Sequence, residues 1–164
     1  MNREGRTFKG CLYFGLMLTK DGPKVIEYNA RFGDPETQVI LPRLKTDLFD
    51  IMLAVSEGRL ADIDIEWKDN AVVCIVMASG GYPKSYQKGY EISGIEQAKK
   101  LPETKVYHAG TNLAQGKLVT NGGRVLGVTR QGKDLDEAIK NAYEAVKLIS
   151  FKDVFYRQDI GVKK

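Results

Sequence analysis

The sequence predicts an α+β fold built mainly of antiparallel strands, with one long helix near its end. Two apolar runs of strand length, residues 10–19 and 71–78, indicate strands that are buried on both faces. The tripeptide Asn121-Gly122-Gly123 indicates a tight reversal between two strands. Residues 134–149 carry apolar side chains at helical spacing, which predicts a single long amphipathic helix.

The 164 residues suffice for two small domains, and a polar stretch at residues 59–70 separates the two strand-bearing parts. We therefore predict one domain over residues 1–66 and a second, strand-rich domain over residues 67–164. A hydrophobic content of 43% excludes a disordered chain. The sequence also lacks a run of about 18 apolar residues, so we expect no membrane span.

The first domain begins with a predicted hairpin. Residues 10–19 form its first strand, Asp21-Gly22 supplies the tight turn, and residues 24–30 return as the second strand. Asp34 followed by Pro35 then predicts a helix with Asp34 as its N-cap, running towards Leu41 and ended by Pro42.

A second helix is predicted over residues 47–57, closed by Gly58 in a left-handed cap. Its apolar stripe consists of Leu48, Ile51, Met52 and Val55. In the second domain, short strands are predicted at residues 90–92, 105–109, 117–119 and 124–130. Asp134 and Glu137 form a capping box for the long helix, whose core-facing residues are Leu135, Ala138, Ile139, Ala142 and Val146.

Charge and cysteine usage limit the function classes. The 25 basic and 21 acidic residues give a net charge of +4, spread along the chain rather than gathered in one stripe. This dispersal favours a small anionic ligand, or an ordinary solvated surface, over nucleic acid. Cys11 and Cys74 lie inside apolar runs without a CxxC partner, so we expect buried thiols and a cytoplasmic, reducing compartment.

Glu27 and Asn29 are the first candidates for chemistry. Two residues apart on a strand, their side chains project from the same face. A carboxylate beside an amide carbonyl suits Mg²⁺ or Mn²⁺, whose shell water and nucleotide phosphates complete. The alternative is an ordinary wet sheet face. The apolar partner strand argues for burial, and an unpartnered Glu and Asn would be costly there.

Two neighbouring residues extend this pattern. Arg31 occupies the next alternate position, where a guanidinium can stabilise charge on a transferred phosphoryl group or form a salt bridge to Glu27 or Asp34. Backbone N–H groups at the helix start after Asp34 favour an anion.

Residues 27–31, Glu-Tyr-Asn-Ala-Arg, resemble the E-x-N-x-R element that closes the metal site of ATP-grasp enzymes. Their continuation to Gln38, R-F-G-D-P-E-T-Q, resembles the phosphoribosylamine–glycine ligase family, whereas biotin-type carboxylases continue R-x-Q-V-E-H. Segments at residues 77–83, 108–111, 120–126 and 156–161 resemble the same family in the same order. The resemblance covers essentially the whole chain.

The resemblance implies the carboxy-terminal part of an ATP-grasp domain followed by the small carboxy-terminal domain of the ligase. The implied reaction joins glycine to 5-phosphoribosylamine through glycyl phosphate, with ATP as co-substrate and Mg²⁺ or Mn²⁺ as cofactor. Glu27 and Asn29 would hold the ion, Arg31 would stabilise the phosphoryl group, and Asp34 and Glu36 would shape the substrate pocket.

By similarity of place, Arg124 would hold the ribose phosphate, or be a plain hairpin arginine. The lone His108 is better explained as a structural residue than as a catalytic base. Family members also carry an amino-terminal domain and a nucleotide-gripping subdomain that these residues do not match. We therefore expect the 164 residues alone to be inactive. The alternatives are a non-catalytic remnant that binds a nucleotide or a partner chain, and another ATP-grasp enzyme such as a carboxylase.

Overall fold

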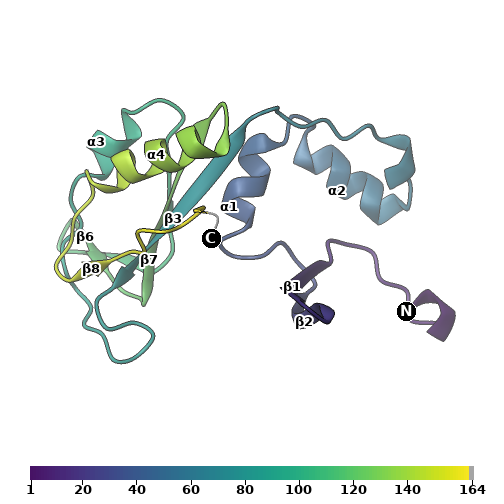
Figure 1. Ribbon diagram of the computed structural model, residues 1–164, viewed down its shortest axis with the longest axis horizontal. Helices are drawn as coiled ribbons and strands as arrows, with labels where there is room; N and C mark the ends of the chain where they lie inside the picture. Colours follow the sequence, from purple (N-terminus) through teal and green to yellow (C-terminus); the bar gives the residue numbers. More distant parts are fainter. Residues whose placement is uncertain (163–164) are drawn as a thin grey trace. The chain divides into compact units, whose positions relative to one another are not determined.

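The computed structural model describes residues 1–162, and the chain divides into two compact units (Figure 1). Unit 1 comprises Met1–Thr37 and Leu44–Lys68, and unit 2 comprises Gln38–Arg43 together with the chain from Asp69 onward. In the sequence, the first boundary between the units falls within the short helix α1 (Thr37–Ile40), after Thr37. The functional division into domains 1–66 and 67–164 stays a prediction.

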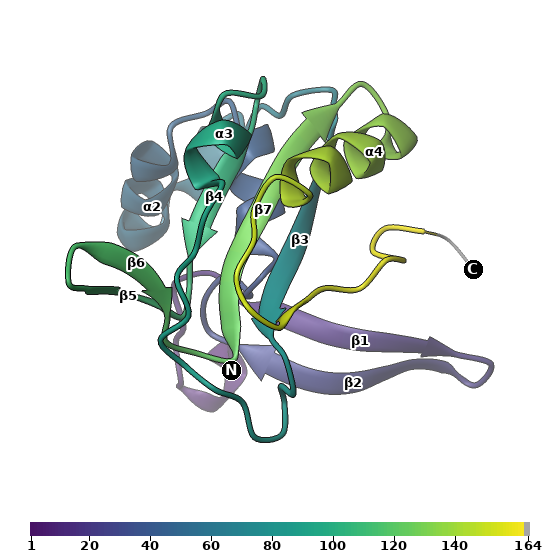
Figure 2. The same ribbon diagram turned by 90° about the vertical axis from the view of Figure 1, so that its left-hand side faces the viewer.

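Unit 1 contains the two-stranded antiparallel sheet β1–β2 and three helical segments (Figures 1 and 2). Its elements are η1 (Asn2–Glu4), β1 (Tyr13–Thr19), β2 (Gly22–Asn29), α2 (Leu48–Glu57) and η3 (Leu60–Asp62). The predicted hairpin is confirmed: Thr19 pairs with Gly22 across a two-residue turn. Gly22 has φ +92°, and the Thr19 hydroxyl donates to its carbonyl at 2.8 Å.

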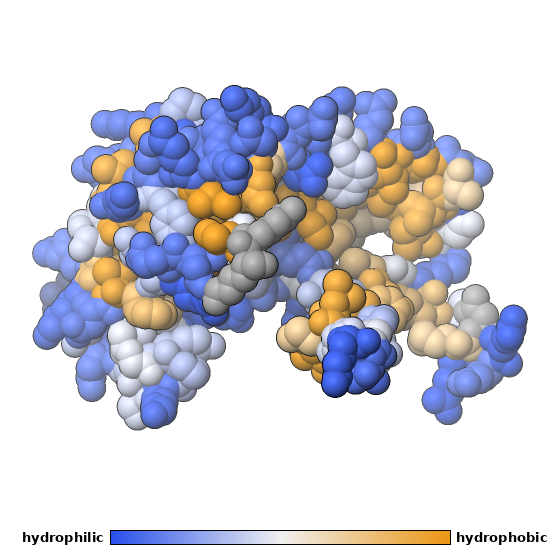
Figure 3. Space-filling model, viewed as in Figure 1, coloured by the Kyte–Doolittle hydropathy of each residue, from blue (hydrophilic) through white to orange (hydrophobic). Residues whose placement is uncertain are grey.

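The prediction that the first strand is buried on both faces is wrong. The strand begins at Tyr13, and Gly15 is its one buried residue. Leu16, Met17 and Leu18 are 49%, 54% and 82% exposed, because no layer of unit 1 covers them. Figure 3 shows apolar side chains at the surface over the hairpin and over α2.

The region after the hairpin also differs from the prediction. Residues 34–36 form a turn and α1 begins only at Thr37, so Asp34 is not its N-cap. The Gly33 carbonyl accepts hydrogen bonds from the Thr37 amide at 3.0 Å and from its hydroxyl at 2.6 Å, which fixes the turn instead. The α-helix ends at Ile40 and continues as the 3₁₀ turn η2 (Leu41–Arg43), which contains Pro42.

Helix α2 has the predicted Gly58 cap, and Asp47, expected as its first residue, is its N-cap. Asp47 accepts a hydrogen bond from the Phe49 amide at 2.8 Å, and Gly58 adopts φ +78°. The predicted apolar stripe is only partly correct. Ala54 is the buried residue of the helix, whereas Met52 is 61% exposed.

Unit 2 is built on a four-stranded sheet in the order β4-β7-β3-β8, with antiparallel neighbours throughout (Figure 2). The strands are β3 (Ala71–Ser79), β4 (Lys105–His108), β7 (Arg124–Gly132) and β8 (Val154–Phe155). Helices α3 (Ile95–Lys99) and α4 (Leu135–Val146) accompany the sheet. The core includes Ile75, Met77, Leu126, Val128 and Val146, each fully buried.

Asp134 caps α4 as predicted, but the return bond of the capping box involves the residue before the cap. The Glu137 amide donates to Asp134 at 2.9 Å, and the Glu137 carboxylate accepts from the Lys133 amide at 2.7 Å. The helix ends at Val146 rather than Ile149, although Ile149 still packs in the core. Leu135, expected to face the core, is 37% exposed.

The Asn121-Gly122-Gly123 hairpin is a wrong prediction. Strand β6 (Lys117–Thr120) pairs with β5 (Thr111–Ala114) across Gln115-Gly116, which have φ +50° and +76°. Residues 121–123 instead connect this ribbon to β7. Their glycines permit a close backbone approach, since a Cβ on Gly122 would lie 2.8 Å from the Gly110 Cα.

Three other expectations can be compared with the structure. Residues 90–92 do not form a strand, and Glu91 alone among them makes an isolated bridge, to Val119. Cys74 is buried as expected, but Cys11 is only half-buried, because it precedes β1 instead of lying within a covered strand. No helix of residues 1–162 is long and apolar enough to cross a membrane.

Candidate functional site

The hairpin register places the two candidate metal ligands on one face. Glu27 lies opposite Gly15, and Asn29 lies opposite Tyr13. Directly opposed residues of an antiparallel pair share a face, so Tyr13, Gly15, Glu27 and Asn29 form one surface. We call these four residues the ligand face. A Cβ on Gly15 would lie 3.0 Å from the Glu27 Cγ, so the Glu27 side chain crosses the space that Gly15 leaves open.

The two candidate ligands touch each other. The Asn29 Nδ2 donates to the Glu27 Oε1 at 3.2 Å. The Asn29 side-chain carbonyl oxygen does not take part in this bond and is the atom of the amide that can bind a cation. The expectation that both would be buried is wrong: Glu27 is exposed and Asn29 half-buried. Exposure removes the desolvation cost and leaves both oxygens accessible to a ligand.

These oxygens fit a hard divalent cation. Among residues 1–162, no group of three or more His, Cys, Asp or Glu side chains gathers as a metal cluster. A cation on the ligand face would therefore take one carboxylate and one amide oxygen from the protein and complete its shell with water or phosphate. Mg²⁺ accepts this arrangement, since it keeps several waters and uses few protein carboxylates.

The charge of Glu36 affects the pKa of Tyr13 on the ligand face. Burial, followed by the charge of Glu36 and a hydrogen bond to its carboxylate, raises the pKa of the Tyr13 phenol, and the Glu27 charge adds to the shift. On its other side the Glu36 carboxylate lies against Gly33, where a Cβ would be 2.5 Å from Oε2. Tyr13, Gly15 and Gly33 are site residues that sequence reasoning missed.

Arg31 and Asp34 lie in the segment between the ligand face and α1. Both are exposed, and the Arg31 guanidinium donates to the Phe32 carbonyl at 2.7 Å. Strand β2 ends at Asn29, so Arg31 follows the strand instead of continuing it. Their roles in chemistry stay predictions.

Arg124 belongs to unit 2, where it opens β7. Its carbonyl accepts from the Gly110 amide at 2.9 Å, and its side chain is exposed. The Tyr82 ring lies against Gly123, where a Cβ would be 2.1 Å from Cδ2, and the Ser79 hydroxyl donates to the Gly122 carbonyl at 2.8 Å. The Arg124 backbone is therefore held rigidly while its guanidinium remains accessible.

His108 ends β4 and its Nδ1 lies 3.2 Å from the Thr111 hydroxyl, a contact expected of a structural histidine.

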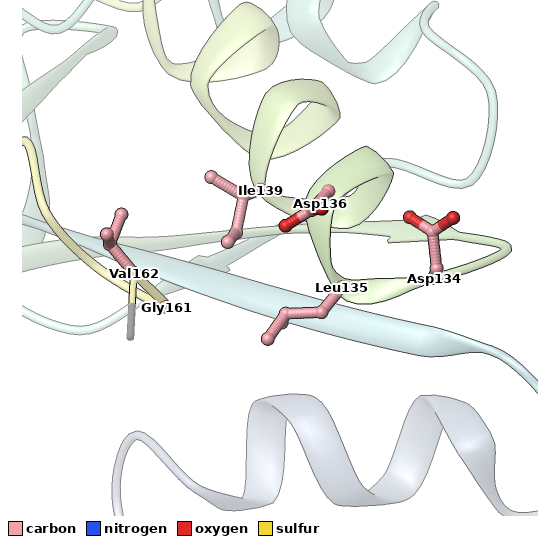
Figure 4. A pocket seen from close by; sticks show the side chains of 6 residues that line it. All are labelled: Asp134, Leu135, Asp136, Ile139, Gly161 and Val162. Atoms are coloured by element: carbon pink, nitrogen blue, oxygen red, sulfur yellow. The ribbon is translucent and has the colours of Figure 1, made fainter. Parts of the chain in front are cut away.

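A cavity of about 630 Å³ lies at the start of α4, lined by Asp134, Leu135, Asp136, Ile139, Gly161 and Val162 (Figure 4). It contains none of the predicted site residues, and Asp134 is already engaged as the helix cap.

Comparison with known families assigns both parts of the chain. Residues 72–163 match the family model described as "Phosphoribosylglycinamide synthetase, C domain". Residues 1–37 match the model for the ATP-grasp (A) domain of the same synthetase. The second match includes the whole ligand face.

Individual relatives resemble nearly all of the chain. The phosphoribosylamine–glycine ligase of Caldanaerobacter subterraneus subsp. tengcongensis is 53% identical over 161 residues, covering 98% of this chain and 38% of the relative. The trifunctional purine biosynthetic protein adenosine-3 of Gallus gallus is 54% identical, covering 99% of this chain and 16% of the relative. The chain thus spans well under half the length of these relatives.

Among solved structures, phosphoribosylamine–glycine ligase from Thermotoga maritima matches with a TM-score of 0.82 and 37% identity, covering 97% of this chain and 39% of that one. The N5-carboxyaminoimidazole ribonucleotide synthetase of Thermotoga maritima matches with a TM-score of 0.55 at 18% identity, covering 87% of this chain and 37% of that one. The second likeness concerns the fold alone. The expected α+β fold is confirmed.

Proposed function

Because this chain belongs to the phosphoribosylglycinamide synthetase family, we propose that it forms part of an ATP-dependent ligase that joins glycine to 5-phosphoribosylamine. The observation that carries the proposal is the Glu27–Asn29 pair, whose side chains meet on one face of a segment similar to the ATP-grasp domain. The product would be glycinamide ribonucleotide, formed in purine biosynthesis.

The reaction proceeds in two steps. A glycine carboxylate oxygen bonds to the γ-phosphorus of ATP while the bond to the bridging oxygen breaks, which gives glycyl phosphate and ADP. The amine nitrogen of 5-phosphoribosylamine then bonds to the carbonyl carbon, phosphate leaves, and the nitrogen loses a proton. Such catalysis depends mostly on positioning and charge neutralisation.

The residues of unit 1 supply the phosphoryl end of the site. A bound Mg²⁺ or Mn²⁺ neutralises charge on the terminal phosphates. Glu27 and Asn29 hold that ion through one carboxylate and one amide oxygen. Arg31, whose exposed guanidinium follows the ligand face, stabilises the transferred phosphoryl group. Asp34 and Glu36 shape the adjacent substrate pocket.

Arg124 holds the ribose phosphate of the second substrate. Its backbone is fixed by a hydrogen bond from the Gly110 amide to its carbonyl, and its side chain is exposed. A guanidinium binds phosphate by two parallel hydrogen bonds, which favours Arg over Lys here. A chain with two free thiols suits the cytoplasm, where we place the reaction.

Turnover requires groups that these residues do not supply. The relatives are more than twice as long, and the family implies a nucleotide-gripping portion in the remainder. We expect the 164-residue chain alone to form no amide product from ATP, glycine and 5-phosphoribosylamine. Measurable turnover by the purified chain would contradict this expectation.

The test is complementation. The chain is mixed with the portion of the Caldanaerobacter ligase that it does not match, and formation of ADP and glycinamide ribonucleotide is measured. We expect activity that Glu27→Gln abolishes, because the exchange removes the carboxylate that holds the ion. Asp50→Asn, which neutralises an exposed carboxylate of α2, serves as the matched control and should retain activity. Equal activity of both variants would remove Glu27 from the site.

A further inference from the structure

Two consecutive glycines stand directly before Arg124, in the segment that joins β6 to β7. Both positions require glycine: a Cβ on Gly122 would lie 2.8 Å from the Gly110 Cα, and a Cβ on Gly123 would overlap the Tyr82 ring. Glycine also has the greatest backbone freedom of all residues. Unless other groups restrict this pair, the backbone that leads to Arg124 can therefore adopt several conformations.

Backbone hydrogen bonds hold the two ends of the segment. The Gly110 amide donates to the Arg124 carbonyl at 2.9 Å, and the Gly110 carbonyl accepts from the Asn121 amide at 2.7 Å. Residues 121 and 124 are thus both tied to one residue, Gly110. The two glycines between them need contacts of their own.

Ser79, the last residue of β3, supplies these contacts. Its amide donates to the Gly123 carbonyl at 2.8 Å, and its hydroxyl donates to the Gly122 carbonyl at 2.8 Å. The Ser79 side chain is buried, with 3% of the residue exposed, so little water competes for this bond. Because β3 lies beside β7 in the sheet, Ser79 restricts both glycines from the interior of unit 2 (Figure 2).

We propose that Ser79 is a positioning residue for phosphate binding by Arg124. Its hydroxyl fixes the glycine pair, and thereby the start of β7 from which the exposed Arg124 side chain extends. A binding group that is already in place loses less conformational freedom when the ligand arrives, which increases affinity. The inference rests on the proposed role of Arg124 and adds to it a residue from the neighbouring strand.

The experiment titrates the 164-residue chain with ribose 5-phosphate and follows its amide signals by nuclear magnetic resonance, which measures weak affinities. Ribose without phosphate serves as the blank. We expect Ser79→Ala to weaken binding about 5-fold, the equivalent of one neutral hydrogen bond. Arg124→Ala removes a charged partner and should weaken it about 10-fold or more. The double variant should bind no more weakly than Arg124→Ala, since Ser79 acts only through Arg124.

Two further variants separate positioning from stability. Thr129→Val is the matched control: it removes another buried hydroxyl, which donates to the Lys105 carbonyl at 3.4 Å, from the same strand as Arg124. It should lower the thermal unfolding temperature and leave the affinity unchanged. Ser79→Thr adds a methyl group at a buried position but keeps the hydroxyl, so it should lower stability and bind as the unchanged chain does.

The outcomes separate this inference from the proposed function. If Arg124→Ala weakens binding and Ser79→Ala does not, Arg124 keeps its role and that of Ser79 is overturned. An equal cost of Ser79→Ala with and without Arg124 overturns it too, as does an affinity that follows stability in Thr129→Val and Ser79→Thr.

If the unchanged chain does not bind ribose 5-phosphate, or Arg124→Ala binds it normally, the proposed role of Arg124 falls and this inference falls with it. The metal pair is tested separately, by Glu27→Gln.

Discussion

Unit 2 packs β3 and β7 against α4 around a continuous core, whereas unit 1 leaves most apolar side chains of its hairpin in contact with water. Among the described residues of unit 1, Ala54 is the only apolar side chain that is buried. The oxygen-rich ligand face nevertheless lies in unit 1. The buried core that stabilises the chain lies in unit 2, whereas the candidate metal ligands lie in unit 1. Mutations can therefore change the free energy of unfolding and the candidate metal chemistry separately.

The largest expected effect on the free energy of unfolding comes from shortening a core side chain in unit 2. Leu126 is fully buried in the sheet, so Leu126→Ala removes packed atoms and leaves a cavity that costs about 2–5 kcal/mol of unfolding free energy. Leu18→Ala makes the same chemical change at a position that is 82% exposed, and we expect a change within about 0.5 kcal/mol. Urea unfolding followed by circular dichroism measures both. Comparable losses would mean that the hairpin is covered in solution.

Replacing either of two glycines by alanine should have an intermediate effect on the free energy of unfolding. Gly94 in unit 2 and Gly22 in unit 1 have φ +85° and +92°, so alanine is strained by about 1 kcal/mol or more at either position. The surroundings differ: a Cβ on Gly94 would lie 1.7 Å from the Leu148 carbonyl oxygen, while a Cβ on Gly22 meets nothing within 4 Å.

Gly94→Ala should therefore cost a further 1–3 kcal/mol or so beyond the strain, because backbone has to move. Gly22→Ala should show the strain alone. Thermal unfolding of both variants, scanned side by side, tests this. Equal losses at the two sites would show that conformation, rather than packing, decides the cost in both units.

The sequence predicted the hairpin, the Gly58 cap of α2, strand β3 and the Asp134 cap of α4, because each depends on local chemistry. It also placed Glu27 and Asn29 on one face, since alternation along a strand needs no tertiary information. What it missed is the pairing across the hairpin. Counting from the turn, Leu18 pairs with Pro23, and this register extended would set Tyr13 opposite Tyr28.

A bulge between Gly15 and Leu16 shifts the register by one residue and brings Tyr13 opposite Asn29 instead. No residue pattern predicts that bulge, so the place of Tyr13 opposite Asn29 could not be predicted. Asn121-Gly122-Gly123 failed for a related reason. Its glycines serve a close backbone contact with Gly110, and a turn motif cannot distinguish that use from a hairpin.

The smallest expected effect is a change in the pKa of one tyrosine, Tyr13, measured beside that of Tyr107. Burial, then the Glu36 charge, raises the pKa of Tyr13 in unit 1, while burial also raises the pKa of Tyr107 in unit 2, where a hydrogen bond to Thr129 partly opposes it. A raised folded-state pKa means that each tyrosine contributes stability that is complete below its ordinary pKa and is lost as pH rises towards the folded value.

Glu36→Gln should lower the pKa of Tyr13 and leave that of Tyr107 unchanged, because only Tyr13 senses that carboxylate. The ring carbon signals of both tyrosines, followed by nuclear magnetic resonance through the alkaline range, measure the two values separately, and Tyr13→Phe and Tyr107→Phe assign them. An unchanged Tyr13 titration would show that burial and the Glu27 charge, without Glu36, account for its raised pKa.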